Sequence, residues 1–212
     1  MKTDDLIAAI SADAKSARPP IASIVWLAAG AGLIGAAIVF LSLLQIRPDI
    51  GEAIFDPSFL YKWVLTLTLL ASAMFVVLQL ARPQPISSDR LLLLLAPAAV
   101  LLAGIAYELV MLPQAEWMPT MMGNNAAACM IFIPLISALP LAAFLVALRQ
   151  GAPSRPALTG AVAGLASTGI GATLYASHCT NDSPLFMAAW YVIGATVVAA
   201  TGAYFGARLL RW

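Results

Sequence analysis

The stretch IASIVWLAAGAGLIGAAIVFLSLLQI, residues 21–46, contains no charged residue and is preceded by Pro19 and Pro20. A helix needs about 20 consecutive apolar residues to cross the hydrocarbon core of a bilayer. This stretch is long enough to do so, and five more apolar stretches follow it along the chain. We therefore predict six membrane-spanning helices, over residues 21–46, 63–81, 91–112, 127–148, 157–177 and 185–207.

The composition supports a membrane protein with little mass outside the bilayer. Of the 212 residues, 62% are hydrophobic and 10% are charged, whereas soluble domains are about half apolar and a quarter charged. We expect an all-α, polytopic fold with a tail at residues 1–20, one transmembrane domain at 21–207 and a short end at 208–212. A net charge of +1 without clustered Lys or Arg argues against direct binding of nucleic acid.

The basic residues predict how the chain crosses the membrane. Nine of the eleven fall in alternate gaps between the apolar stretches, and only Arg47 and Lys62 fall in the others. Because loops rich in Lys and Arg remain in the cytoplasm, this pattern places both termini on the cytoplasmic side. The nine are Lys2, Lys15, Arg18, Arg82, Arg90, Arg149, Arg155, Arg208 and Arg211.

Two pairs of glycines predict where the helices pack closely. Gly160 and Gly164 form a Gly-x-x-x-Gly motif in the fifth stretch, and Gly202 and Gly206 form another in the sixth. Small residues at this spacing allow two membrane helices to approach each other closely. We interpret these glycines as packing surfaces and not as the lining of a substrate path.

Most motifs of enzymes are absent from the chain. There is one histidine, His178, and there is no Cys-x-x-Cys, His-Glu-x-x-His, Walker or Gly-x-Ser-x-Gly motif. We therefore expect no catalysis and no required cofactor. Glu108 is the one acidic residue well inside a predicted span, which makes it a functional candidate. It also lies close to the outer end of that span, where a structural hydrogen bond would equally explain it.

The two cysteines are predicted to lie at the same depth on the outer side. Cys129 begins the fourth stretch, and Cys179 follows His178 in the loop between the fifth and sixth stretches. Three interpretations remain open. The cysteines form a structural disulfide; or they are free thiols that respond to oxidants or bind a soft metal ion, with His178 as a third ligand; or they are unrelated small residues.

The N-terminal tail has the pattern of a short helix over residues 3–16. Thr3 can cap it, and Asp4 and Asp5 stand in its first turn, where the helix dipole favours negative charge. An apolar stripe follows at Leu6, Ile7 and Ile10, with Ala14 continuing it. Such a helix can rest on the membrane surface or dock in a groove of a partner protein.

A set of short segments along the whole chain matches a known family, most specifically from Leu174 to Trp190. The segments are Met1 to Ile7, Arg47-Pro48-Asp49, Asp56-Pro57 with Phe59, Cys129, Arg149 to Pro153, Arg155-Pro156, Leu174-Tyr175, His178-Cys179, Asp182 to Phe186, Trp190 and Arg208 to Trp212. In these segments the chain resembles the NrsF-like family of six-span anti-sigma factors, bacterial inner-membrane proteins that restrain an extracytoplasmic-function sigma factor.

The resemblance implies a function that the spacing of residues does not show. It implies that the cytoplasmic side holds a sigma factor away from RNA polymerase, and that Cys129 and Cys179 sense metal or oxidative stress. The helix over residues 3–14 then becomes a candidate sigma contact, together with the loops 82–90 and 149–156. The alternatives are a small transporter or exporter, and a membrane thiol oxidoreductase.

Overall fold

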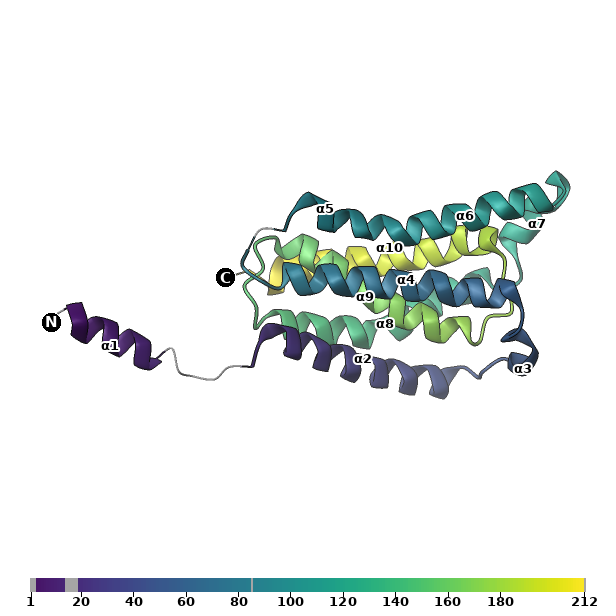
Figure 1. Ribbon diagram of the computed structural model, residues 1–212. Helices are drawn as coiled ribbons and strands as arrows, with labels where there is room; N and C mark the ends of the chain where they lie inside the picture. The colour runs from purple at the N-terminus through teal and green to yellow at the C-terminus, as the bar shows by residue number, and fades with distance from the viewer. Residues whose placement is uncertain (1–2, 14–18, 85, 212) are drawn as a thin grey trace.

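The computed structural model describes residues 3–13, 19–84 and 86–211, and over these residues its regular secondary structure is all helix, with no strand (Figure 1). Among these residues, six helices are long and apolar enough to cross a membrane. They are α2 (Ile21–Leu43), α4 (Pro57–Leu80), the composite helix Ser88–Met111, α8 (Ala126–Leu148), α9 (Pro156–Ala176) and α10 (Pro184–Leu209). The predicted fold class is confirmed.

Shorter helices accompany the six spans. The chain begins with α1 (Thr3–Asp13), and α3 (Ile50–Ala53) follows α2. The composite helix consists of α5 (Ser88–Leu91), the 3₁₀ turn η1 (Leu92–Leu95) and α6 (Ala96–Met111), and it is followed by η2 (Gln114–Glu116) and α7 (Trp117–Met122). The last residues of the predicted tail helix, 14–16, and the basic residues Lys2, Lys15 and Arg18 lie outside the described residues.

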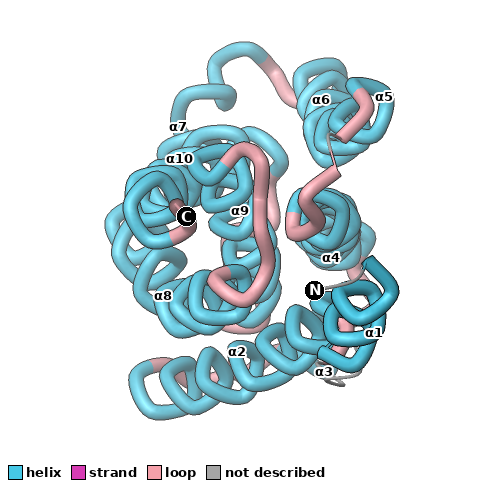
Figure 2. The backbone as a smooth tube through the Cα atoms, turned by 90° about the vertical axis from the view of Figure 1, so that its left-hand side faces the viewer, coloured by secondary structure: helices cyan, strands magenta, loops and turns pink. Residues whose placement is uncertain are grey.

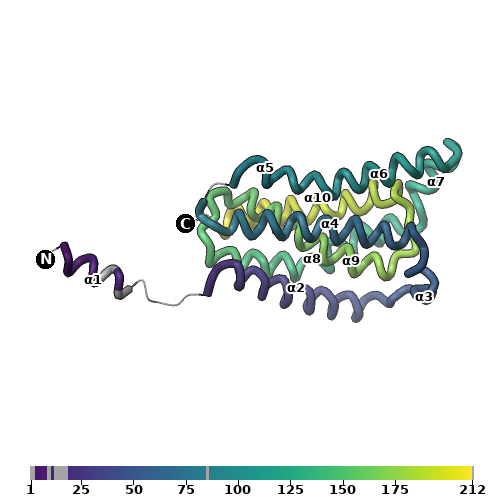
Figure 3. Tube along the Cα trace, in the orientation of Figure 1, coloured from purple at the N-terminus to yellow at the C-terminus, as the bar shows by residue number. Residues whose placement is uncertain are grey.

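Successive long helices run in opposite directions, so the two described ends of the chain lie at the same end of the bundle (Figures 1 and 3). We call this the terminal end; it also holds residues 82–84, 86–87 and 149–155, which lie in the loops between helices. The opposite end, which holds α3, α7 and the loop at residues 177–183, is called the cysteine end.

The helix α9 forms the centre of the bundle. In the most apolar 18-residue window of α9, 67% of the residues are buried. In the corresponding window of Ser88–Met111, only 11% are buried. In the view along the bundle (Figure 2), α9 lies among α4, α8 and α10, and it packs against all three. The composite helix is peripheral and packs on α4 and α10, while α2 packs mainly on α8.

The glycine motifs make the closest contact in the bundle, as predicted. Gly160 and Gly164 of α9 face Gly202 and Gly206 of α10. A Cβ atom added at Gly160 would lie 2.8 Å from the Cα atom of Gly206, and one at Gly164 would lie 2.7 Å from the Cα atom of Ala199. Only glycine therefore permits this distance between the two helices.

One helix boundary differs from the prediction in a way that matters for function. We predicted that the second span begins at Trp63, but α4 begins at Pro57. The side chain of Asp56 accepts a hydrogen bond from the Ser58 amide at 2.7 Å, and Pro57 occupies the first turn. An N-cap aspartate followed by proline is a strong start signal for a helix. The early start carries Lys62, which we expected in a loop, into the helix.

Candidate functional site

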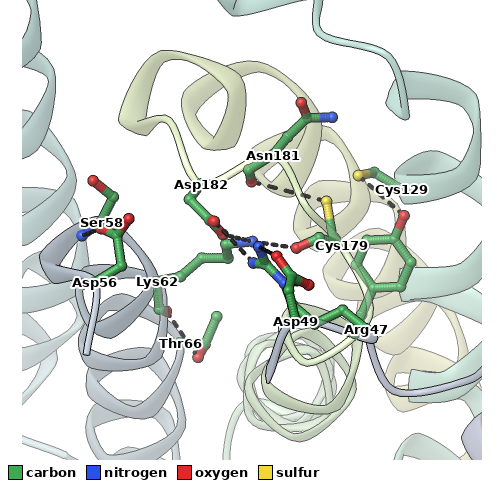
Figure 4. A network of polar contacts seen from close by, with 11 residues as sticks. Arg47, Asp49, Asp56, Ser58, Lys62, Thr66, Cys129, Cys179, Asn181 and Asp182 are labelled. Atoms are coloured by element: carbon green, nitrogen blue, oxygen red, sulfur yellow. Dashed lines mark hydrogen bonds and ion pairs between the residues drawn. The ribbon is translucent and has the colours of Figure 1, made fainter. Parts of the chain in front are cut away.

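The structure brings the two cysteines together at the cysteine end. Cys129 lies in the first turns of α8, Cys179 lies just after α9, and the side chains of both are fully buried. The Cys129 thiol donates a hydrogen bond to the Tyr175 hydroxyl at 3.4 Å, and the two sulfur atoms lie close enough to influence each other's ionisation. Both cysteines are free thiols (Figure 4). The structure therefore brings the two thiols to one place with no disulfide between them.

The loop that carries Cys179 is held between two helix ends. The helix α9 ends at Ala176, and the Cys179 amide donates to the Tyr175 carbonyl at 3.0 Å, which continues the helical turn. At the other end of the loop, the Ser183 hydroxyl accepts hydrogen bonds from the amides of Leu185 and Phe186 and caps α10. The end of α9 and the start of α10 therefore fix the position of the loop that carries Cys179.

His178 contacts the segment that follows α2. Its Nδ1 atom lies 2.6 Å from the Gln45 carbonyl oxygen, a contact that requires the proton on Nδ1. Over the described ranges, no group of three or more His, Cys, Asp or Glu side chains is arranged to hold a metal ion. A three-ligand site of Cys129, Cys179 and His178 is not assembled in this conformation, and His178 instead ties the loop to the end of α2.

Beside the thiols lies a buried ionic cluster, formed by Arg47, Asp49, Lys62 and Asp182 (Figure 4). Asp182 bridges the two cations: its Oδ2 accepts from Arg47 Nη1 at 2.9 Å, and its Oδ1 pairs with Lys62 Nζ at 2.5 Å. Asp49 completes the cluster through two hydrogen bonds from Arg47, at 2.8 and 2.7 Å. Residues far apart in the chain are thereby joined at one point.

The ion pairs of the cluster neutralise cations whose burial alone would destabilise the fold. Lys62 is fully buried and Arg47 is 8% exposed, and the Phe59 ring lies 5.5 Å from the Arg47 guanidinium and 6.0 Å from Lys62 Nζ. The hydrogen bond with Asp49 raises the pKa of Arg47 further above its ordinary value. The same hydrogen bond lowers the pKa of the solvent-facing Asp49 carboxyl to about 2. Both groups therefore remain charged at neutral pH.

Sequence reasoning missed this cluster, although the chain contained a signal for it. Arg47 and Lys62 are the only basic residues on the side of the membrane that should be poor in them. Cations that break the positive-inside pattern need a neutralising partner when they are buried. Their partner Asp182 lies more than a hundred residues away in the chain, and only the fold shows the pairing.

The cluster and the thiol pair form one site, joined by Lys62. Its ammonium group donates a hydrogen bond to the Cys179 carbonyl oxygen at 2.8 Å. The nearby Cys129 thiol, the positive charge of Lys62 and the backbone at Asn181 lower the pKa of the Cys179 thiol below its ordinary value, against the opposing effects of burial and of Asp182. The site therefore favours a thiolate at Cys179.

Glu108 supports the far end of the same loop. Its Oε2 atom accepts hydrogen bonds from the Ser183 hydroxyl and from the Leu185 amide, both at 2.8 Å. A carboxylate at this place stabilises the start of α10, where unpaired amides and the helix dipole favour negative charge. In this structure Glu108 acts as a helix cap supplied by a neighbouring span.

The predicted sigma-contact residues lie at the opposite end of the molecule. Figure 1 shows α1 standing apart from the bundle beyond the terminal end. Thr3, Asp4 and Asp5 are exposed in its first turn. Leu6 is 43% and Ile7 is 59% exposed, while the side chain of Ile10 lies outside the described residues. An apolar pair therefore stays accessible on this helix.

Comparison with known proteins relates this chain to one family along almost its whole length. The profile of the family described as "NrsF: Negative regulator of sigma F" matches residues 10–212. The chain is 34% identical to the "Probable anti-sigma-F factor NrsF" of Azospira oryzae over 213 residues, and 36% identical to the "Anti-sigma-F factor NrsF" of Caulobacter vibrioides over 217 residues. Both alignments cover 100% of each chain. No solved structure matches the chain.

Proposed function

The chain belongs to the NrsF family of negative regulators of sigma F, and from this premise we propose that it is a membrane anti-sigma factor controlled by its cysteine pair. It retains an extracytoplasmic-function sigma factor at the terminal end and releases it when Cys129 and Cys179 are oxidised. The observation that carries the proposal is the full-length similarity to two anti-sigma-F factors.

The proposal includes an orientation in the bacterial inner membrane. The terminal end faces the cytoplasm, because nine of the eleven basic residues belong to the tail, to the loops of that end or to the C-terminal segment. The cysteine end then faces the periplasm, where disulfides form and persist. A sigma factor held at the terminal end stays close to its polymerase but cannot join it.

The helix α1 is the proposed sigma contact. It is exposed, carries Asp4 and Asp5 in its first turn and presents the accessible pair Leu6 and Ile7. An amphipathic helix of this kind binds by laying its apolar face into a groove of the partner. The loops 82–90 and 149–156, which lie at the same end, are the second part of the proposed contact.

Two packed helices connect the thiol pair with this contact. Cys129 lies on α8 and Cys179 follows α9, and the loop that joins these helices lies at the terminal end (Figure 3). A Cβ atom added at Gly151 of that loop would lie 2.6 Å from the Ala81 carbonyl oxygen and 3.5 Å from Ile21 Cδ1. A disulfide that shifts α8 against α9 therefore acts on residues close to the start of α2, where the N-terminal segment joins the bundle.

The signal must favour the released state over the retaining state. A change from 1:99 to 99:1 requires about 5.5 kcal/mol of difference between the two states. A covalent bond that is compatible with only one arrangement of α8 and α9 provides such a difference. A soft metal ion that bridges the two thiols remains a second form of the signal, which the sequence predicted.

The test is purification of the tagged protein from its native bacterium in mild detergent, followed by mass spectrometry of bound proteins. We expect a stoichiometric sigma factor that is lost after treatment with peroxide. The double variant Cys129→Ser and Cys179→Ser should retain the sigma factor under both conditions. Loss of the sigma factor from the double variant on treatment would contradict control by the thiol pair.

The proposed contact has its own test. The variants Leu6→Ser and Ile7→Ser remove apolar surface that is exposed in the free protein, so each should weaken retention about tenfold, or about 1.4 kcal/mol. The control is Ser11→Ala, which removes a hydroxyl that donates to the Ala8 carbonyl oxygen within the same helix. Equal retention by all three variants would remove α1 from the contact.

The transporter alternative has less support from the arrangement of polar residues. It requires a polar route through the bundle, for which the chain offered Glu108, Gln45 and Gln79. Glu108 caps α10 at the cysteine end, whereas Gln79 accepts a hydrogen bond from Arg90 at the terminal end. These groups are engaged at opposite ends and do not line one path.

A further inference from the structure

We propose that Lys62 makes Cys179, and not Cys129, the thiol that reacts first with a hydroperoxide, and that Cys129 then closes the disulfide. This inference rests on the proposed function, since it assigns a different role to each cysteine of that site. Lys62 is the positioning residue: it contacts the main chain of Cys179 and sets the charge around its sulfur atom.

Two groups of the loop that carries Cys179 hold the ammonium group of Lys62 in place. Its ammonium donates to the Cys179 carbonyl at 2.8 Å and pairs with Asp182 at 2.5 Å. The side chain is fully buried, so water screens its charge poorly. A buried cation fixed in this way acts on the nearest ionisable sulfur atom.

The charges around Lys62 do not cancel its field at the thiol. Asp182 is shared with Arg47, which binds its second carboxylate oxygen at 2.9 Å. The remaining carboxylate, Asp49, lies beyond Arg47, and its side chain is 48% exposed. Two buried cations therefore share one largely buried carboxylate. A thiolate at Cys179 supplies a second negative charge in the buried part of the site.

The hydrogen bonds distinguish the two sulfur atoms. The Cys129 thiol acts as a donor, with the Tyr175 hydroxyl at 3.4 Å, so this sulfur keeps its proton. The Cys179 thiol donates to the Asn181 carbonyl oxygen over a longer distance, 3.8 Å, so its proton is held less firmly than that of Cys129. The lowered pKa of Cys179 agrees with this assignment, because a neighbouring cation stabilises a thiolate.

The reaction has two steps that balance. The Cys179 thiolate attacks one oxygen of hydrogen peroxide; an S–O bond forms, the O–O bond breaks, and the departing hydroxide takes a proton to leave as water. The Cys129 sulfur then attacks the sulfur of the Cys179 sulfenic acid, forming the S–S bond, and the sulfenic oxygen leaves as water with the Cys129 proton. The two thiols together lose two electrons, and the peroxide accepts them.

The first experiment uses the full-length protein in lipid nanodiscs and needs no variant at Lys62. A small neutral reagent, methyl methanethiosulfonate, is reacted with Cys129→Ser and with Cys179→Ser, and the modification rate is followed against pH. We expect the midpoint of the Cys179 profile to lie well below the value of about 8.5 for a free cysteine, and below the midpoint of the Cys129 profile. Coinciding profiles, or the reverse order, would overturn the proposal.

The second experiment tests Lys62 itself. Hydrogen peroxide is added in the presence of dimedone, which traps sulfenic acid, and the label on Cys179 is quantified in the Cys129→Ser background. Lys62→Met keeps the apolar stem and removes the charge, so labelling should slow about tenfold and the pH midpoint should rise. Lys62→Arg should restore most of the rate. Glu52→Gln, a charge change on an exposed residue at the same end, should have no effect.

These results can be separated from a failure of the proposed function. Both experiments measure thiol chemistry without a sigma factor, so they are unaffected if the partner is wrong. If Lys62→Met reacts at the wild-type rate and with the wild-type pH profile, the role of Lys62 is refuted even when peroxide still releases a sigma factor. If the chemistry is as expected but no sigma factor is bound, only the anti-sigma proposal fails.

Discussion

The basic residues at the two ends of the bundle differ in how deeply they are buried and in whether they form ion pairs. At the cysteine end, Arg47 and Lys62 are buried and bound to carboxylates. At the terminal end, the six described basic residues are all exposed: Arg82, Arg90, Arg149, Arg155, Arg208 and Arg211. A buried cation must keep its partner, whereas an exposed one is solvated whatever lies nearby. The comparison indicates a firmly held cysteine end and a solvated terminal end, which fits the proposed roles of the two ends.

The largest effect on stability is expected when the carboxylate shared by the two buried cations is removed. Asp182→Asn leaves Lys62 without its ion-pair partner in a water-poor site, so we expect a loss of about 3 kcal/mol in the free energy of unfolding. The measurement is thermal unfolding in detergent, followed by tryptophan fluorescence. The matched control is Glu52→Gln, which should stay within about 0.5 kcal/mol of the wild type. Equal unfolding of the two variants would show that the cluster is not stabilising.

A smaller effect is expected where the same loop meets α10. Glu108→Ala removes the acceptor for the Ser183 hydroxyl and the Leu185 amide, and the loss of a helix cap costs about 1 to 2 kcal/mol. Glu108→Gln keeps an acceptor and should lose less. Glu116→Ala, at an exposed carboxylate nearby, is the control. A Glu108→Ala variant as stable as this control would mean that the Ser183 hydroxyl alone caps the helix.

Acid provides a weaker test of the outer side of the cluster. The hydrogen bond from Arg47 lowers the Asp49 pKa from 3.8 to about 2, so its contribution to stability is present above 3.8 and is lost as the pH falls through about 2. The difference in unfolding temperature between wild type and Asp49→Asn should be constant from about pH 7 to about pH 5, and should shrink below about pH 4. A difference that grows on acidification would reverse the sign of this interaction.

The smallest change in stability is expected at the open end. Ile7→Ser on α1 alters an exposed side chain, so the free energy of unfolding should stay within about 0.5 kcal/mol of the wild type. The same variant is expected to weaken retention of the sigma factor, which separates binding from stability. A marked loss of stability would show instead that α1 packs against the bundle.

Prediction from the sequence succeeded where a local pattern carries the information. Five of the six spans both begin and end within a few residues of the predicted positions, because apolar length and flanking prolines act along the chain. The exception is the start of α4, where the Asp56 cap was overlooked and Lys62 was misplaced. Gly160 and Gly202 were also correctly assigned to packing, since their spacing matches one face of a helix.

The candidate site could be predicted only in part. The depth of Cys129 and Cys179 follows from the order of the spans, but their contact depends on how α8 packs beside the end of α9. Asp182 lies 135 positions from Arg47, and no local pattern pairs two charges at that separation. The role of Glu108 as a cap also needed the neighbouring span to be placed.

The sequence by itself determined that this is a six-span helical membrane protein with its two ends on one side, because hydrophobic length and charge distribution are properties of each segment alone. It also placed both cysteines at the other side. Only the tertiary structure decided that the two thiols meet, that Lys62 is buried beside them and that Asp182 neutralises both cations. These features depend on distances between segments, which are set when small residues let the central helix α9 pack closely against its neighbours.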